Sequence, residues 1–544
     1  MGFRFAVVIS VFVIAYSFLL FHLYRLQVLH NENYLARAES QYEASGLLKA
    51  TRGGIFFTDK EGRLSPAVLN KEFPVIYAVP QVIEDPIETA SRISSILKIQ
   101  TEELENKFGK TNDRYELLVK KADPELVSQI KELKIKGVYT EQEYDRFYPF
   151  NSLMAQVIGF IGPDNAGGES GRYGLESYYE KELSGENGVD KDGKIISPQK
   201  GEDLNLTVDS NIQIEVEKIL TRLVSSFEAE GGSVIVQDPK TGGILAMESV
   251  PSFDPNNYNQ SSLENFLNPT TQAIYEPGSV FKVITMVSAL DAGKITPETT
   301  YVDTGVLKVS GREIRNWDLK AHGKVTMTNV IEKSINTGAA FAEKQIGHSL
   351  FKTYLEKFGF GEKTNVDLPG EISGDFKRLK PGAPEIAFST ASFGQGVAVT
   401  PLELITAFSS IANGGHLMRP YLNSALGPKE IRRTISASAA REVAEMMVSA
   451  VDKAEVGHIR GYSLAGKTGT AQVPDFNKGG YTADVINTYI GFGPTTDPKF
   501  VILIKLNKPK GAPLAGLSVV PAFRDLAQFI LNYYNISPDR IYQN

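Results

Sequence analysis

Apolar and polar positions follow the two-residue period of β-strands and the longer period of helices in different parts of the chain. In the first part, short β-like runs at residues 73–78 and 137–140 are mixed with helical patterns at residues 103–108 and 124–133. Neither an internal repeat nor a low-complexity linker interrupts them. The pattern predicts a first region, residues 31–205, in which short strands and helices alternate.

A second region begins where a strand leads into a helical pattern at residues 211–223. Apolar runs at residues 234–236 and 244–247 flank the turn Asp238-Pro239-Lys240-Thr241-Gly242, and this arrangement predicts a hairpin. We therefore place the start of a second domain, residues 206–544, at this point.

Another strand pair and two helices are predicted toward the C-terminus. Residues 488–492 and 500–506 flank a Pro-rich turn and predict an antiparallel pair. Thr400-Pro401 offers a cap hydroxyl and a first-turn proline for a helix that closes at Gly414-Gly415. Residues 522–533 are amphipathic and would cover the sheet. The second region therefore begins with strands, continues with helices and ends with strands and a helix. This order predicts an α+β fold with helices on an antiparallel sheet.

The N-terminus predicts a membrane anchor. Residues 5–23 are almost wholly apolar and approach the roughly 20 residues that span a bilayer. No small-x-small cleavage site follows them. We expect residues 1–30 to form an uncleaved signal anchor, a single-pass transmembrane helix with a short cytoplasmic tail, although a buried core helix would show the same pattern. Because Arg4 and Arg25 flank the segment, the positive-inside rule favours this orientation only by a small margin.

Composition narrows the classes of function. A chain of 544 residues with 42% hydrophobic content can form two or three domains with substantial cores. The absence of cysteine excludes disulfides, thiolate catalysis and cysteine-based metal sites. A net charge of −7 without a basic run argues against nucleic acid as a partner, and the 6 histidines lack the spacing of metal ligands. We expect neither a metal nor another cofactor.

The first candidate for chemistry is Ser279-Val280-Phe281-Lys282. An apolar run of helical length, residues 280–290, predicts Ser279 at a helix N-terminus, where free N–H groups favour a developing oxyanion. Residues three apart share a helix face, so the Lys282 amine can reach the Ser279 hydroxyl. Burial would lower the pKa of Lys282 toward that of a usable base. A serine cap beside an exposed lysine is the alternative interpretation.

The second candidate is Ser334-Ile335-Asn336, which falls between two helical stretches, where a loop or helix start is expected. The Ser334 hydroxyl could relay a proton, and the Asn336 amide could hold a substrate peptide group. Both residue types are also common helix caps, which is the alternative for this motif.

The third candidate is Lys467-Thr468-Gly469-Thr470 at a predicted strand end. Gly469 has no side chain, so a peptide substrate could add to the sheet as an extra edge strand. Lys467 with the hydroxyls of Thr468 and Thr470 could bind a carboxylate. A plain edge strand with a protective lysine is the alternative.

Each short motif is weak by itself. Ser-x-x-Lys recurs at Ser95, Ser128, Ser197 and Ser349, and Lys-Thr-Gly recurs at Lys240. Ser95, Ser128 and Ser349 lie in helical patterns with a solvated face, and Lys240 lies in the hairpin turn. The order and context of the three candidate motifs therefore carry the argument.

Together the three motifs resemble the signature shared by penicillin-binding proteins and class A β-lactamases. Residues from about 201 to 535 are similar to the transpeptidase domain of class B penicillin-binding proteins at further stretches. These include residues 204–209, 238–247, 275–279, 394–396 and 412–415. Arg52-Gly53-Gly54-Ile55 and Gly174-Leu175-Glu176 resemble the family's non-catalytic pedestal domain. One departure is that residues 56–58 separate Ile55 from Asp59 by one residue more than the family pattern.

The resemblance implies a penicillin-binding, serine β-lactamase-like transpeptidase domain at residues 206–544. It also implies an elongated, β-rich, dimerisation-like pedestal at residues 31–205. The transpeptidase domain would lie on the extracytoplasmic side of the cell membrane. Its substrate would be the D-Ala-D-Ala end of a peptidoglycan stem peptide, and β-lactams would acylate the same serine.

The resemblance also implies a role for each residue of the motifs. Ser279 would be the nucleophile, Lys282 would take its proton, and Ser334 with Lys467 would pass a proton to the leaving amine. The substrate-binding residues would be Asn336, Thr468, Gly469 and Thr470. Backbone N–H groups of Ser279 and Thr470 would form the oxyanion hole.

Partners follow from the same resemblance. Class B members work with a SEDS-family glycosyltransferase that polymerises the glycan, and with other division or elongation proteins. Residues 519–524 and 77–80 resemble division-type members more than elongation-type members, which favours a septal role.

Three alternatives remain open at this point. A membrane-anchored β-lactamase would use the same motifs but would need fast deacylation, and no deacylating carboxylate can be placed. A bifunctional synthase would need a glycosyltransferase domain, for which residues 31–205 are short. A non-catalytic β-lactam sensor would keep the fold without transpeptidation.

Overall fold

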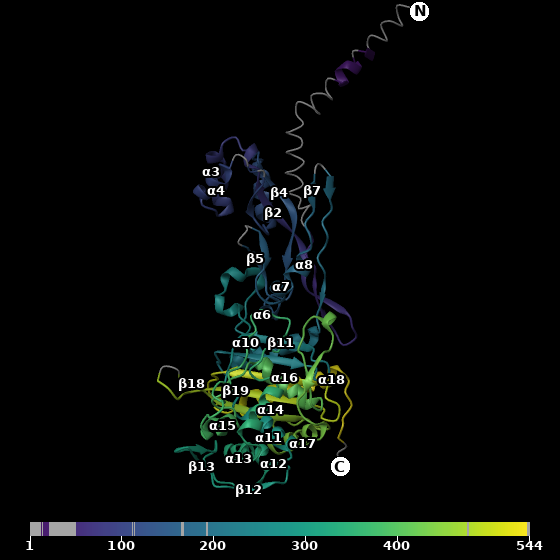
Figure 1. Ribbon diagram of the computed structural model, residues 1–544. Helices are drawn as coiled ribbons and strands as arrows, with labels where there is room; N and C mark the ends of the chain where they lie inside the picture. Colours follow the sequence, from purple (N-terminus) through teal and green to yellow (C-terminus); the bar gives the residue numbers. More distant parts are fainter. Residues whose placement is uncertain are drawn as a thin grey trace, which may run out of the picture. The chain divides into compact units, whose positions relative to one another are not determined.

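The computed structural model describes residues 12–13, 15–20, 50–110, 113, 115–164, 168–191, 194–475 and 478–540 (Figure 1). The chain forms two compact units, each assembled from separate stretches of sequence. The first unit comprises Met1–Gly53, Leu69–Phe147 and Lys181–Glu202, and the second comprises Gly54–Val68, Tyr148–Glu180 and Asp203–Asn544. The domain boundary predicted at residues 205/206 stays a prediction.

The first unit is built on a long strand with helices packed against it. Strand β2 pairs antiparallel with β3 and with β4 over its residues 69–78. The main elements of the unit are β2 (Leu64–Ala78) from Leu69 onward, α3 (Pro86–Leu97), α4 (Thr101–Phe108), β3 (Glu116–Val119), α5 (Pro124–Leu133) and β4 (Val138–Phe147). Asp85 caps α3 by accepting from the Glu88 N–H, and Pro86 occupies its first turn. Apolar side chains of the strands and helices, among them Ile76, Ile93 and Phe108, form the core.

The second unit contains a five-stranded antiparallel sheet. Its strands, in spatial order, are β11 (Ile244–Val250), β10 (Gly231–Gln237), β20 (Phe500–Asn507), β19 (Tyr481–Gly493) and β18 (Ala465–Pro474). Figure 1 shows strands from the middle of the chain, in teal, beside C-terminal strands, in yellow. The predicted α+β class and both predicted hairpins are confirmed.

One face of the sheet packs against α9 (Ser210–Ser226) and α18 (Ala515–Tyr533). Alternate strand residues such as Val234 and Ile504 point to this face and form the largest core. Helix α18 begins at Ala515 rather than at the predicted residue 522, and Pro521 lies inside it. The proline deprives only the carbonyl of Leu517, an exposed residue, of a helical partner, while buried neighbours such as Phe523 hold the helix on the sheet.

Helices on the opposite side of the sheet carry the rest of the unit. They are α10 (Pro269–Gln272), α11 (Lys282–Asp291), α12 (Met327–Glu332), α13 (Asn336–Ile346), α14 (His348–Lys357), α15 (Glu385–Ala391), α16 (Pro401–Ala412) and α17 (Ala437–Ala454). Helix α16 packs on the sheet, and α11 lies among α12, α13, α14 and α17. The predicted start of α16 is confirmed by a capping box between Thr400 and Glu403.

Smaller elements complete both units. The strands are β1 (Ile55–Thr58), β5 (Ile161–Pro163), β6 (Glu169–Gly171), β7 (Val189–Lys191), β8 (Lys194–Ile196), β9 (Leu204–Asn205), β12 (Thr300–Asp303), β13 (Val306–Val309), β14 (Arg312–Arg315), β15 (Gly323–Thr326), β16 (His416–Met418) and β17 (Glu430–Arg433). The short helices are α6 (Ala155–Ile158), α7 (Gly174–Tyr178) and α8 (Glu180–Ser184). The 3₁₀ turns are η2 (Pro80–Val82), η3 (Pro255–Gln260), η4 (Leu263–Phe266), η5 (Gly278–Phe281) and η6 (Ser424–Leu426). The register of β1 against β2 shifts between Ile55 and Phe56, next to the residues that depart from the family pattern.

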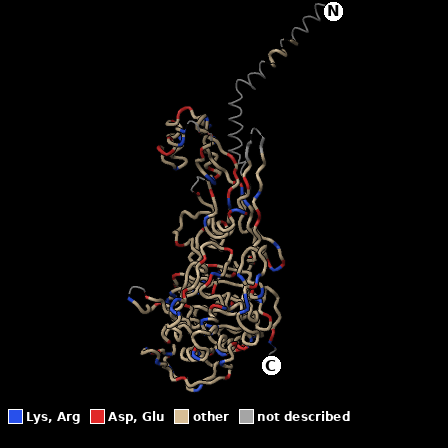
Figure 2. The backbone as a smooth tube through the Cα atoms, in the orientation of Figure 1, with Lys and Arg blue, Asp and Glu red and all other residues tan. Residues whose placement is uncertain are grey.

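Most of residues 5–23, where the membrane-spanning helix is predicted, lie outside the described residues. Among the described residues, none of the helices combines the length and the apolar character needed to cross a bilayer. The anchor stays a prediction. Figure 2 shows Lys and Arg interspersed with Asp and Glu along the described backbone.

Candidate active site

Ser279 lies in the 3₁₀ turn η5, which runs directly into α11. The predicted position at a helix N-terminus is confirmed, with the difference that the first turn is 3₁₀ rather than α-helical. In a 3₁₀ turn, residues three apart eclipse each other, so the turn directs Ser279 and Lys282 the same way. Gly278 has a φ of +59°, and a Cβ there would lie 3.1 Å from the Ala471 Cβ. Glycine therefore allows the turn to approach strand β18.

Lys282 is fully buried at the start of α11. Its Nζ lies 3.1 Å from the Ser279 Oγ and 3.1 Å from the Ser334 Oγ, and it donates to the Ser334 carbonyl oxygen at 2.5 Å. Burial, and then the nearby cation of Lys467, hold the pKa of Lys282 well below its ordinary value. A neutral amine in this position can accept the proton of a serine hydroxyl.

Ser334 lies in the loop between α12 and α13 with a φ of +55°. Its Oγ is shared by Lys282 Nζ and by Lys467 Nζ, which lies 3.0 Å away. The left-handed backbone is unusual for a residue with a side chain. Hydrogen bonds hold the peptide groups on both sides of it, because Lys282 donates to the Ser334 carbonyl and Trp317 Nε1 donates to the Lys333 carbonyl at 3.0 Å.

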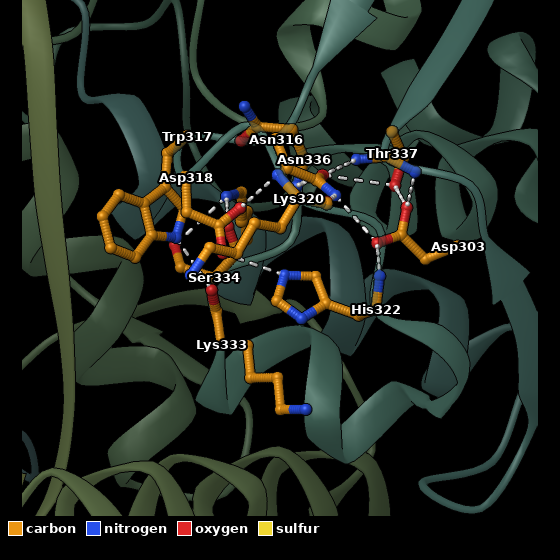
Figure 3. A network of polar contacts seen from close by, with 12 residues as sticks. Asp303, Asn316, Trp317, Asp318, Lys320, His322, Lys333, Ser334, Asn336 and Thr337 are labelled. Atoms are coloured by element: carbon orange, nitrogen blue, oxygen red, sulfur yellow. Dashed lines mark hydrogen bonds and ion pairs between the residues drawn. The ribbon is translucent and has the colours of Figure 1, made fainter.

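Asn336 is the first residue of α13 (Figure 3). Its backbone N–H donates to the Asn316 Oδ1 at 3.1 Å, and its Nδ2 donates to the Arg315 carbonyl at 2.8 Å. The side-chain amide is thereby held in one orientation, and its second N–H can donate to a peptide carbonyl of a substrate.

Lys467 is buried in strand β18, at the end of the sheet's strand order. Besides Ser334, its Nζ contacts the Thr468 carbonyl at 3.0 Å and the Thr468 hydroxyl at 3.4 Å. Burial lowers the pKa of Lys467 to about 7. The two lysines and two hydroxyls thus form one connected chain of proton donors and acceptors.

Gly469 and Thr470 continue strand β18. A Cβ at Gly469 would lie 2.8 Å from the Pro277 carbonyl oxygen, so the strand can approach the Ser279 turn only with glycine there. The Thr470 hydroxyl accepts from the Ala515 N–H at 3.1 Å and donates to the Asn487 Oδ1 at 3.3 Å. A ligand carboxylate would have to compete with these bonds, and the carboxylate-binding role of Thr470 stays a prediction.

The structure therefore brings Ser279, Lys282, Ser334 and Lys467 into direct contact, with Asn336 and the rest of the β18 motif adjacent. The four other Ser-x-x-Lys sequences lie in different elements of the fold. Ser95, Ser128 and Ser349 lie in α3, α5 and α14, and Ser197 follows β8. Lys240 lies in the β10–β11 turn, where it pairs with Asp497.

Comparison with known families agrees with this geometry. Residues 232–528 match the penicillin binding protein transpeptidase domain, and residues 47–206 match the penicillin-binding protein dimerisation domain. The chain belongs to the class B penicillin-binding proteins.

Two relatives illustrate the range of the similarity. Peptidoglycan D,D-transpeptidase FtsI of Escherichia coli is 30% identical over 564 residues, covering 99% of this chain and 93% of that protein. Stage V sporulation protein D of Bacillus subtilis is 32% identical over 483 residues, covering 83% of this chain and 74% of that protein. Among solved structures, penicillin binding protein 2X from Streptococcus thermophilus has a TM-score of 0.71 at 22% identity, covering 90% of this chain and 81% of that chain, and supports the fold.

In this penicillin-binding protein, residues outside the three motifs form hydrogen bonds that position them, and the sequence analysis did not identify these residues. Glu276 accepts from the Gly396 N–H at 2.9 Å and from the Tyr481 hydroxyl at 2.9 Å. Burial raises the pKa of Glu276. Gly394, with a φ of +78°, accepts from the Gly278 N–H at 3.1 Å. Gly394 and Gly396 had been noted only as similar to the family, without a role.

Trp317 and Asn316 were also missed on the other side of the site. A signal existed for one of them, because Trp317 is the single tryptophan of the chain. No local pattern marks Asn316, whose partners Asn336 and Asp303 lie 20 and 13 residues away. Among the described residues no cluster of His, Asp and Glu could hold a metal ion. The expectation of no cofactor stays a prediction.

Proposed function

We propose that this peptidoglycan D,D-transpeptidase cross-links stem peptides in cell wall synthesis through a Ser279 acyl-enzyme. The Ser279 Oγ forms a bond to the penultimate D-alanine carbonyl carbon, and Lys282 Nζ takes its proton. The backbone N–H groups of Ser279 and Thr470 receive the oxyanion, where losing one donor typically costs about 3–4 kcal/mol in barrier. The single observation that carries the proposal is the buried Lys282 amine within 3.1 Å of both serine hydroxyls.

Release of the leaving group follows the same contacts in reverse. The proton passes from Lys282 through the Ser334 hydroxyl, supported by Lys467, to the nitrogen of the terminal D-alanine. The C–N bond breaks and D-alanine departs. The amine of a second stem peptide then attacks the ester carbonyl, the Ser279 Oγ leaves with a proton, and a new peptide bond cross-links the two chains.

Substrate contacts are assigned to the remaining motif residues. Lys467 with the hydroxyls of Thr468 and Thr470 would bind the terminal carboxylate, and Asn336 would align the peptide. Gly469 would leave room for the donor peptide beside β18. β-Lactams carry a carboxylate and an amide at comparable positions and would acylate the same serine.

Intact-mass spectrometry after incubation with benzylpenicillin tests the nucleophile and the ligand class together. The wild-type chain should gain the mass of one penicillin, and Ser279→Ala should gain none. Ser349→Ala is the matched control, because Ser349 also precedes a lysine by three residues in a helix, and it should be labelled like the wild type. Labelling of Ser279→Ala would overturn the assignment.

The alternatives of a β-lactamase and of a non-catalytic sensor are distinguished by turnover. A transpeptidase should hydrolyse a chromogenic cephalosporin slowly and should join donor and acceptor peptides in a cross-linking assay. Rapid cephalosporin turnover would favour a β-lactamase, and penicillin labelling without cross-linking would favour a sensor.

We further propose that residues 1–30 anchor the chain in the cell membrane with the catalytic unit outside the cytoplasm. Support comes from the apolar run at residues 5–23. Extraction of membranes with carbonate should leave the full chain in the membrane fraction and should release a variant that lacks residues 1–30.

A septal role beside a SEDS-family glycosyltransferase is proposed on the similarity to FtsI. A fluorescent fusion should concentrate at division sites and should co-purify with such a glycosyltransferase. A uniform distribution along the lateral wall would favour the elongation role.

A further inference from the structure

Helix α13 begins at the substrate-binding motif without a cap of its own. Ile335 occupies the N-cap position and has no polar side chain, so the first N–H groups of the helix need acceptors from elsewhere. Asn316 supplies one, because its Oδ1 lies 3.1 Å from the Asn336 nitrogen and 3.3 Å from the Thr337 nitrogen. A residue that follows β14 therefore caps a helix that starts 20 residues later.

Asn316 is itself held firmly, with 1% of its surface exposed. Its Nδ2 donates to the Asp303 Oδ2 at 2.8 Å and to the Lys320 carbonyl at 3.0 Å. Asp303 is also buried, and it accepts from the Thr337 hydroxyl at 2.7 Å, from the Gly305 N–H and from the His322 N–H. Although burial alone would raise the pKa of Asp303, these hydrogen bonds keep it below its ordinary value. The carboxylate thus fixes which end of the Asn316 amide faces α13.

The neighbouring residue completes the arrangement around Asn336. The Arg315 carbonyl accepts from the Asn336 Nδ2 at 2.8 Å, so Arg315 and Asn316 hold the side chain and the backbone of Asn336, respectively. Figure 3 shows Asn316, Asn336, Thr337 and Asp303 in one connected network. Neither Lys282 nor Lys467 hydrogen-bonds to Asn316 or Asp303, and Asn336 is the member of this network that belongs to the substrate-binding motif.

We propose that Asn316 is a positioning residue that sets the Asn336 amide for the amide group of the donor peptide or the β-lactam side chain. The proposal rests on the proposed acyl-transfer function and refines it. A substrate amide must meet Asn336 at hydrogen-bond distance, and a displacement on the order of 1 Å is costly to catalysis. Asn316 therefore contributes to the rate only for substrates that carry an amide for Asn336 to bind.

Two β-lactams that differ in that amide give the test. Benzylpenicillin carries an acylamide side chain, whereas 6-aminopenicillanic acid has the same ring system without it. The second-order rate of acylation of the full chain is measured with both compounds. In Asn316→Ala the rate with benzylpenicillin should fall by about tenfold or more, and the rate with 6-aminopenicillanic acid should change much less. The pH at which acylation is half-maximal should stay unchanged because Lys282 is untouched.

Two further variants sharpen the result. Asn336→Ala should show the same selective loss, a slower rate with benzylpenicillin and a nearly unchanged rate with 6-aminopenicillanic acid. Adding Asn316→Ala to it should lower the benzylpenicillin rate little further, because both residues act on one interaction. Asn413→Ala is the matched control. The Asn413 side chain makes three hydrogen bonds at the end of α16, two with His416 and one with the Pro239 carbonyl, and its loss should leave both rates unchanged.

The outcomes separate a positioning role from a structural one. An equal fall with both compounds, or a full additive loss in the double variant, would overturn the proposal. If Asn316→Ala does not fold, Asp303→Asn keeps the shape of the network, weakens its hold on Asn316 and must show the same selective loss. Failure of the wild-type chain to be acylated by either compound would refute the proposed function instead.

Discussion

Lys282 and Lys467 are two buried lysines that share the Ser334 hydroxyl, and their environment explains how lysine can handle a proton at neutral pH. A buried ammonium group loses hydration, so the neutral amine is favoured. The pKa of Lys467 falls to about 7, and that of Lys282 is lowered by burial and by the cation of Lys467. One of the pair can therefore serve as a base while the other carries charge.

Trp317 also holds Ser334 in place, because its Nε1 donates to the carbonyl of the preceding residue, Lys333. In Trp317→Phe a smaller aromatic ring takes the place of the indole and the donor to the Lys333 carbonyl is lost, so the left-handed Ser334 is held less firmly. The loss of one hydrogen bond, about 1 kcal/mol, corresponds to about fivefold slower acylation. Because Ser334 serves every substrate, stopped-flow rates with benzylpenicillin and 6-aminopenicillanic acid should fall together. Tyr462→Phe removes a comparable bond, to the Ile536 carbonyl, beside the core that the sheet forms with α9 and α18. This variant should change neither rate, and unchanged rates in Trp317→Phe would refute the role of Trp317.

Glu248 makes stability depend on pH. Burial raises its pKa from 4.5 to about 8, and the charge of Glu217 adds to this, while Met154 N–H and Gln213 Nε2 donate to it. The folded state then binds a proton that the unfolded state has lost between pH 4.5 and 8, so the free energy of unfolding should decrease as pH rises through this window, by up to about 1.4 kcal/mol per pH unit from this group. Glu248→Gln, which resembles the protonated acid, should flatten that slope in thermal unfolding at several pH values. An identical slope in both proteins would contradict the assignment.

At the scale of elements, local patterns predicted the strands of the main sheet and helices such as α9 and α16, but not α17 or the short strands β12–β15. A cap hydroxyl, a first-turn proline and closing glycines predicted the bounds of α16, and apolar runs on either side of a turn predicted the pairs β10–β11 and β19–β20. The start of α18 was missed because its first turns are held by tertiary burial of Ser518, Val519 and Val520, which the sequence does not display. The 3₁₀ turn at Ser279 was missed because it depends on how closely β18 approaches.

That approach of β18 to the Ser279 turn can be tested with Gly469→Ala. Its Cβ would lie 2.8 Å from the Pro277 carbonyl oxygen and 3.0 Å from a Val280 methyl group. The strand must shift, so penicillin acylation should fall by about a hundredfold, since small displacements of positioned groups have effects of this order. Gly516→Ala in α18 meets no atom within 4 Å. This control should keep full activity and unfold at the same or a slightly higher temperature, and normal activity in Gly469→Ala would refute the tight approach.

At the scale of the whole molecule, the second unit is not a continuous stretch of sequence. The segment Tyr148–Glu180 belongs to it together with Asp203–Asn544. Met154 donates to the buried Glu248 at 2.8 Å, and the Tyr179 hydroxyl donates to the buried Asp367 at 2.9 Å. A linear division at residues 205/206 would separate these partners.

A fragment of residues 206–544 should therefore be less stable than residues 50–540. Glu248 and Asp367 would each lose a donor, and a buried polar group without its partner costs about 1–3 kcal/mol. Soluble yield and thermal unfolding of the two fragments are the measurements, with penicillin labelling as a check of the fold. Equal unfolding temperatures would support the predicted linear boundary instead.

The sequence by itself determined the α+β class and the order of the three motifs, because periodicity, caps and three-residue spacing are local properties of the chain. The family followed from the resemblance of these motifs, in that order, to known proteins. Only the tertiary structure decided how the motifs meet. Ser334 and Lys467 are 133 residues apart and touch at 3.0 Å, and Asn316 caps a helix to which no local pattern connects it. Such contacts depend on which distant segments pack together, and the periodicity of each segment shows which face is buried but not which partner covers it.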